Sequence, residues 1–277
     1  MPRPDPWRHR GFLVGSGLLA VFVTAVVLAP LLAPHDPHAV AAGAAATLEA
    51  PKGAHPFGTD ALGRDLLSRV LWGGRVSLTV GVGVELMAAL IGCGVGLVAG
   101  FYGGWTDAFL MRGTDVVMAF PSLVLAIGLI AVFERPGLDK VVLVLVALGW
   151  TTIARVVRGT VLALKGRDYV QAARALGAGD LAIMLRHLLP NALAPLLVAA
   201  TIGVGGNMVA EAGLSFLGLG AQAPTISWGS MLADGQTFLS SAPWVAIFPG
   251  LALLVAVLGV NLFGDGLRDL LDPRFRE

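Results

Sequence analysis

The chain has 277 residues, of which 56% are hydrophobic and only 13% charged, and its mean hydropathy is +0.80. A soluble globular domain carries roughly a quarter of charged residues, so this composition predicts a membrane protein. The net charge of +1 offers no basic surface for nucleic acid. Cys93 is the only cysteine, which excludes an internal disulfide and a thiolate metal cluster.

The first apolar segment runs from residue 11 to about residue 32 and follows a polar tail that contains Arg3, Arg8 and Arg10. A helix of that length is about long enough to cross the roughly 30 Å hydrocarbon layer. A cleaved signal peptide is the alternative, because basic residues precede an apolar core. The length of the apolar run and the prolines that follow it favour a retained span.

Residues 33 to 75 form the first long polar excursion. Thr59 or Asp60 can cap a helix there. The apolar face of that helix would carry Leu62, Leu66 and Val70, opposite Arg64, Asp65 and Arg69. The pattern predicts an amphipathic helix that lies along the membrane surface.

Four polar residues of this excursion could meet around a metal ion, namely His35, Asp36, His38 and His55. Histidines in loops without a metal are the commoner case. The sequence therefore predicts no metal site.

The second span covers residues 76 to 101 and carries Ala88, Gly92, Gly96 and Gly100 at four-residue intervals. In lipid, a ridge of small residues lets another helix approach closely, so this ridge predicts a packing face.

Glu85 lies inside the same span. A carboxylate within a membrane is a functional candidate by default, and a structural hydrogen bond is the alternative. Glu85, Asn207 and Glu211 are the candidates for residues of a transport pathway.

Four further spans are predicted at residues 116–133, 141–157, 191–214 and 244–263. A short loop at residues 102–115 precedes the third span, and Pro121 should kink that span. Between the fifth and sixth spans, residues 211–235 are rich in glycine and poor in charge. This segment predicts a re-entrant or interfacial plug with Trp228 as its anchor.

A polar stretch at residues 168–190 separates the fourth and fifth spans and predicts a helix-turn-helix elbow. Gly177 can take the left-handed conformation that ends the first helix. Asp180 can cap the second helix, which is expected to end before Pro190. A plain linker between spans is the alternative.

The distribution of basic residues predicts the orientation of the six spans. Thirteen of the nineteen lysines and arginines lie on the side of the termini and the elbow, and six lie on the other side. Since basic loops stay in the cytoplasm, both termini and the elbow are assigned to it.

Motifs of catalysis are missing from the sequence. It contains no G-x-x-x-x-G-K-[ST] phosphate loop, and the GLSFL stretch at residues 213–217 lacks the last glycine of a nucleophile elbow. The chain is therefore not expected to be an enzyme.

The elbow resembles the "EAA" loop of ATP-binding-cassette (ABC) importer permeases, the part that docks into a nucleotide-binding subunit. Ala172, Ala173, Gly177 and the pair Leu189–Pro190 match that pattern. Two positions depart from it, because Gln171 replaces the usual Glu and His187 the usual Ile. The resemblance implies that ATPase coupling involves Tyr169, Gln171, Ala172, Ala173, Arg174, Leu176, Gly177, Ala178, Leu189 and Pro190.

Three other sequence segments resemble those of the dipeptide, oligopeptide and nickel permease family, and in particular those of its C-type subunit. These are GTDALGRDLLSR near residue 60, the 211–235 segment, and the tail with GDGLRD and DPR. The resemblance implies an all-α, polytopic type I ABC importer permease with six transmembrane helices and a cytoplasmic coupling helix in a bacterial inner membrane. Implied partners are a second permease in a heterodimer, two ABC ATPases that bind ATP and Mg²⁺, and an extracytoplasmic binding protein, with no cofactor in this chain.

The resulting hypothesis is a permease subunit that forms half of a pathway for short peptides, driven by ATP hydrolysis on other chains. Nickel or another small solute is the alternative cargo, and an ion-coupled secondary carrier or a membrane anchor is the alternative class. The expected organisation is an N-terminal part at residues 1–75, a five-helix core at 76–264 with the elbow at 165–190, and a cytoplasmic tail at 265–277.

Overall fold

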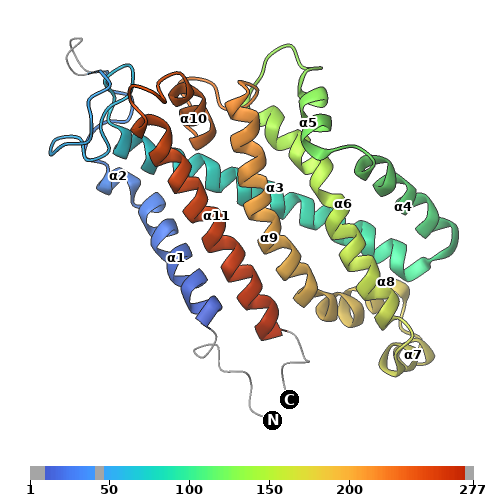
Figure 1. Ribbon diagram of the computed structural model, residues 1–277. Coiled ribbons are helices and arrows are strands. Elements are labelled where there is room, and N and C mark those ends of the chain that lie inside the picture. Colours follow the sequence, from blue (N-terminus) through green and yellow to red (C-terminus); the bar gives the residue numbers. More distant parts are fainter. Residues whose placement is uncertain (1–9, 41–46, 272–277) are drawn as a thin grey trace.

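The computed structural model describes residues 10–40 and 47–271. Within these ranges the chain is helical and forms no strand, only isolated β-bridges at Lys52–His55 and Thr59–Asp65. The prediction of an all-α membrane protein is confirmed (Figure 1). The terminal segments at residues 1–9 and 272–277 lie outside the described residues.

Four helical runs among the described residues are long and apolar enough to cross a membrane: α3 (Leu66–Tyr102), α6 (Leu138–Leu164), Asp180–Phe216 and α11 (Trp244–Leu271). A bent pair, α4 (Gly104–Met118) and α5 (Ser122–Ile130), qualifies as a fifth span when taken together. The N-terminal α1 (Arg10–Val27), followed by the short α2 (Ala29–Leu32), is apolar but shorter. The count of six spans stays a prediction.

Helix α3 begins at Leu66 and continues for 37 residues without a break, so the prediction of a separate surface helix before residue 76 is wrong. Its N-cap is Asp65, whose side chain accepts a hydrogen bond from the Ser68 amide at 2.8 Å. Residues 59–65 are a loop. At about 1.5 Å per residue the helix is roughly 55 Å long, and it runs obliquely behind the other helices (Figure 1).

The small-residue ridge of α3 is a packing face, as predicted, and its partner is α6. A Cβ atom added to Gly92 would lie 2.4 Å from the Trp150 carbonyl oxygen, and one added to Gly96 would lie 2.5 Å from that of Ala154. These distances are shorter than any van der Waals contact. The backbones of α3 and α6 therefore meet where only glycine fits.

The third span is broken rather than kinked. Helix α4 ends at Met118, α5 begins at Ser122 after Pro121, and the two are bent by 85°. Proline lacks a backbone N–H and restricts the residue before it, which explains why one helix ends here and another begins. The short loop predicted at residues 102–115 is also wrong, because α4 begins at Gly104.

The helix after the elbow turn does not end before Pro190, contrary to prediction. Helix α8 (Asp180–Ile183) passes through a π-helical turn at Met184–Leu188 into α9 (Leu189–Phe216). Pro190 is the second residue of α9, directly after the π-helical turn. The cap of α8 is Gly179 rather than Asp180, which is the first residue of the helix.

Trp228 is not an interfacial anchor, because it is only 1% exposed. It begins α10 (Trp228–Gln236), and its indole Nε1 donates a hydrogen bond to the Val70 carbonyl oxygen of α3 at 2.9 Å. It packs in a core cluster with Met208 of α9 and Val245 of α11. The segment after the fifth span is therefore anchored in the protein interior.

We predict that Gly96→Ala lowers the melting temperature of the purified protein, whereas Gly94→Ala does not. An alanine Cβ at position 96 would overlap the Ala154 oxygen and the Val157 side chain, while at position 94 it would meet no atom within 4 Å. The overlap should cost about 1–3 kcal/mol, and alanine otherwise favours a helix over glycine. Thermal unfolding in detergent measures the difference, and equal stability of both variants would contradict the close α3–α6 contact.

Candidate functional site

The elbow at residues 165–190 projects from the end of the bundle opposite α10 (Figure 1). Its first helix is α7 (Asp168–Ala175), and the buried face of α7 consists of Val170 and Ala173. Val170 packs with Ile183 and Leu188 in a core cluster that also contains α3 and α6 residues. The elbow is therefore joined to the bundle by a hydrophobic core.

The turn of the elbow has the predicted left-handed glycine. Gly177 has a φ of +82°, a conformation that residues with a side chain rarely adopt. The Gly177 amide donates to the Arg174 carbonyl oxygen, and the Ala178 amide donates to that of Ala173, both at 3.0 Å. These bonds end α7 in the manner of a Schellman motif.

Two polar side chains secure the start of the elbow, one to α3 and one to the end of α6. The Lys165 ammonium group donates to the Gly100 carbonyl oxygen of α3 at 2.9 Å. The Gln171 side-chain amide donates to the Lys165 carbonyl oxygen at 3.2 Å. A glutamate carboxylate could not donate this bond, so glutamine at this position serves the local fold.

The outward surface of the elbow is uncovered in this chain. Leu176 is 89% exposed and Tyr169 is 41% exposed. Gln171, Ala172, Arg174, Gly177 and Pro190 are also exposed, and Ala178 and Leu189 are partly buried. The predicted coupling residues thus share one outward segment, except for Ala173, which packs inward, and the pair Leu189–Pro190, which belongs to α9.

Two ion pairs connect α6 to α4 above the elbow. The Arg158 guanidinium group donates two hydrogen bonds to the Asp107 carboxylate, the one from Nη2 at 2.6 Å. The Arg155 Nη2 atom lies 2.7 Å from an oxygen of Asp115. Since α6 continues into the elbow, these pairs tie α4 to the same end of the bundle.

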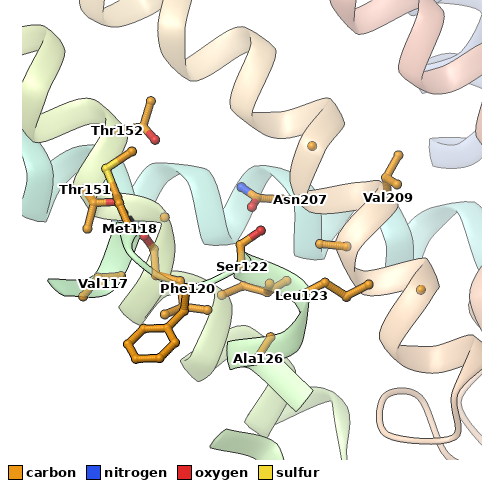
Figure 2. A pocket seen from close by; sticks show the side chains of 16 residues that line it. Val117, Met118, Phe120, Ser122, Leu123, Ala126, Thr151, Thr152, Asn207 and Val209 are labelled. Atoms are coloured by element: carbon orange, nitrogen blue, oxygen red, sulfur yellow. Dashed lines mark hydrogen bonds between the residues drawn. The ribbon is translucent and has the colours of Figure 1, made fainter. Parts of the chain in front are cut away.

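A cavity of about 680 Å³ lies between the broken span, α6 and α9 (Figure 2). Phe120, Ser122 and Leu123 border it where α4 gives way to α5. Thr151 and Thr152 contribute from α6, and α9 contributes residues between Gly206 and Gly213. Its wall is mostly apolar, with a few hydroxyl and amide groups.

Asn207 connects this cavity to Glu85. It lines the cavity from α9, and its side-chain amide donates to the Glu85 carboxylate at 2.9 Å. Glu85 is only 6% exposed and does not line the cavity. Gly203 makes room for the carboxylate, because an added Cβ there would lie 2.2 Å from its oxygen. Two of the three predicted pathway residues are thus in contact, and one of them faces the cavity.

Glu211, the third candidate, lies elsewhere and has a structural environment. It is fully buried and accepts hydrogen bonds from the hydroxyl groups of Ser77, at 3.1 Å, and Ser215, at 2.7 Å. Ser215 in turn accepts the amide of Ala221. Glu211 therefore holds α3 and the loop after α9 in place.

The end of the bundle away from the elbow carries a charge network. Asp60 lies 2.6 Å from the Arg64 Nε atom and 3.4 Å from the Arg69 Nε atom. Asp234 of α10 lies within 4.0 Å of both arginines. Partial desolvation raises the pKa of Asp234, whereas the two guanidinium groups oppose that change. Arg64 and Arg69 thus connect the loop before α3, and α3 itself, to α10.

The cavity residues on the broken span carry little signal in the sequence. Ser122 and Phe120 flank Pro121, and the proline was the one signal that a break would leave side chains facing inward. Asp65 was assigned to a helix face, but it caps α3 and approaches His35 and His55. The sequence holds no local signal for that meeting.

Comparisons with known proteins agree on one family. Residues 92–277 match the family described as binding-protein-dependent transport system inner membrane component. Residues 7–51 match the N-terminal transmembrane domain of oligopeptide transport permease C.

Individual relatives are similar over most of their length. A dipeptide transport system permease of Alkalihalophilus pseudofirmus is 39% identical, with 98% of this chain and 91% of the relative covered. A glutathione transport system permease of Pectobacterium atrosepticum is 41% identical, with 98% and 92% covered. Its counterpart in Escherichia coli is 45% identical over 80% of this chain and 73% of the relative.

We predict that Asn207→Leu lowers the thermal stability of the protein and that adding Glu85→Met restores part of it. The single variant leaves the Glu85 carboxylate without its amide donor, which costs about 1–3 kcal/mol, whereas replacing both partners removes the buried polar group as well. Thermal unfolding measures both effects, with Asn191→Leu as the matched control, because it removes an exposed hydrogen bond to the His187 carbonyl oxygen and leaves no buried carboxylate unpaired. A double variant less stable than Asn207→Leu would contradict this interpretation of the pair.

Proposed function

The chain belongs to the family of binding-protein-dependent transport system inner membrane components, and it is therefore a multi-pass permease subunit of the inner membrane. We propose that it forms half of an ATP-driven import pathway for short peptides. The subunit is not itself an enzyme. The observation that carries the proposal is the elbow, whose exposed surface is fixed to the helices that surround the cavity.

Coupling would begin at the outward surface of the elbow. Leu176 and Tyr169 present apolar surface beyond the bundle, and the adjacent Ala172 allows close approach by another chain. We assign this surface to an ABC ATPase subunit, which would bind ATP and Mg²⁺. The remaining elbow residues hold its shape: Gln171, Ala173, Arg174, Gly177, Ala178, Leu189 and Pro190.

The cavity supports a role in translocation. It is open along one side, and its apolar wall with scattered hydroxyl groups suits a solute that must pass without tight binding. A second, homologous permease would complete it, giving a heterodimer that receives solute from an extracytoplasmic binding protein. Asn207 is the pathway residue that the cavity supports best, with Glu85 behind it and Glu211 in a structural role.

The proposal of a peptide cargo is based on the names of similar proteins, which specify dipeptides and glutathione, a tripeptide. Nickel or another small solute is the alternative cargo. An ion-coupled carrier fits less well, because the carboxylates of Glu85 and Glu211 are each held by hydrogen bonds to neighbouring side chains and form no chain of exchangeable sites.

The proposed orientation in the membrane follows the distribution of lysines and arginines. We place both termini and the elbow in the cytoplasm, and the loops around α10 on the outer side. The N-terminal part at residues 1–75, the core at 76–264 and the tail at 265–277 remain the proposed divisions, although α3 and α11 each run across one of these boundaries.

We predict that Leu176→Glu reduces recovery of the partner ATPase with this chain by at least about tenfold, equivalent to roughly 1.4 kcal/mol. It should also abolish ATP-dependent uptake of a labelled dipeptide into proteoliposomes. Leu176 is 89% exposed, so its replacement should leave the melting temperature unchanged.

The matched control is Leu62→Glu, an exposed leucine at the other end of the bundle, which should retain the ATPase. Normal coupling in Leu176→Glu would show that the elbow is not the docking surface. Uptake of Ni²⁺ in place of dipeptide by the unaltered complex would reject the peptide cargo and leave the coupling intact.

A further inference from the structure

Two histidines and a buried aspartate meet near the N-terminus of α3, beyond the elements used for coupling and translocation. One potential ligand atom from each of His35, His55 and Asp65 lies within 4.8 Å of the other two. We propose that these three side chains bind a divalent transition-metal ion of the zinc type. The proposal does not depend on the transport function.

Asp65 is prepared for a second role besides capping α3. Its side chain is 1% exposed, and its two oxygens face different ways. Oδ2 accepts the amide of Ser68 at 2.8 Å and its hydroxyl group at 2.7 Å. Oδ1 faces the two imidazole rings. The carboxylate is thus oriented by fixed donors on one side, as a metal-ligating carboxylate typically is.

Both imidazole rings direct Nδ1 toward the same oxygen. The distance from Asp65 Oδ1 is 2.9 Å for His55 and 3.7 Å for His35. The first distance fits a hydrogen bond, whereas the second exceeds one. An ion about 2.1 Å from each ligand holds the ligands roughly 3.0–3.5 Å apart, so small side-chain shifts would let one ion contact all three.

The two histidines come from segments that the backbone already holds in place. The His35 amide donates to the Ser68 hydroxyl group at 3.1 Å, which places the chain after α2 against the start of α3. His55 and Lys52 exchange backbone hydrogen bonds at 2.9 and 3.0 Å. The ring centroids are 4.7 Å apart. The site therefore needs little ordering before it binds an ion.

The ligand set and its surroundings select the class of ion. Two imidazole nitrogens and one carboxylate suit zinc and neighbouring transition metals, whereas calcium and magnesium prefer oxygen ligands. A cavity of about 260 Å³ in front of the cluster, bordered by Asp36 and Gly63, leaves space for water to complete the coordination. His35 is 43% exposed, which gives an ion access from solvent.

A bound ion would join the chain after the first span, through His35, to the loop before α3, through His55 and the α3 N-cap Asp65. The same region holds the charge network between α3 and α10. We therefore assign the ion a structural role, in which it holds the chain after α1 and α2 against the start of α3.

The test measures metal binding by the full-length chain, purified with its partner subunits through a tag that contains no histidine. After equilibration with Zn²⁺ and removal of free ion, the complex should carry one more zinc per chain than the His35→Ala and His55→Ala variants. Replacement with Co²⁺ should give ligand-field absorption in the visible region that the variants lack. Cys93 is the only cysteine, so no thiolate band from this chain should appear.

The matched control is His38→Ala, a histidine three residues along the chain that is outside the cluster and should leave zinc binding unchanged. A second measurement needs no variant: Zn²⁺ should raise the melting temperature of the complex, and a chelator should reverse the shift. Equal zinc content in all proteins, loss of zinc in His38→Ala, or no chelator-reversible shift would overturn the proposal.

Discussion

The close contact between α3 and α6 is the constraint on which the rest of the structure depends. Gly92, Gly96 and Gly100 bring the two backbones together at a distance that excludes any side chain. In lipid there is little hydrophobic drive to join helices, so such packing supplies much of the attraction. Helix α3 crosses the bundle obliquely, and α6 leads directly into the elbow. One contact thus joins the helical bundle to the elbow, for which we propose ATPase docking.

The elbow is packed against the α3–α6 pair and extends beyond the helical bundle. Its buried residues share a core with Leu97 and Phe101 of α3 and with Val157 and Val161 of α6. The ion pairs of Arg158 and Arg155 bring α4 into the same unit, and the broken span and α9 line the cavity. A displacement of the elbow would therefore be carried by packed side chains and charged contacts to the cavity wall.

The sequence was sufficient for the class of protein, the apolar helices, the glycine ridge and the left-handed turn at Gly177, because each depends on local composition or spacing. Predictions from the sequence were wrong where contacts between distant residues determine the structure. The sequence predicts Trp228 as an interfacial anchor, but only the fold places Val70 opposite its indole group. Likewise the helical spacing of apolar residues before residue 76 predicts a separate surface helix, whereas α3 begins at Leu66 and runs through Gly73 and Gly74, which pack against Trp228. The meeting of Glu85 with Asn207 spans 122 residues, and no sequence pattern could have indicated it.

The account rests on the elbow facing the cytoplasm, where ATPases act, and accessibility to a membrane-impermeant maleimide tests this most directly. In a Cys93→Ser background, a cysteine replaces either Leu176 on the elbow or Val40 near the other end, both well exposed. In intact cells that lack the partner ATPase, so that the elbow is uncovered, the reagent should label Leu176→Cys only after the membrane is permeabilised, and Val40→Cys at once. Labelling of Leu176→Cys in intact cells would contradict the assignment of the elbow to ATPase coupling.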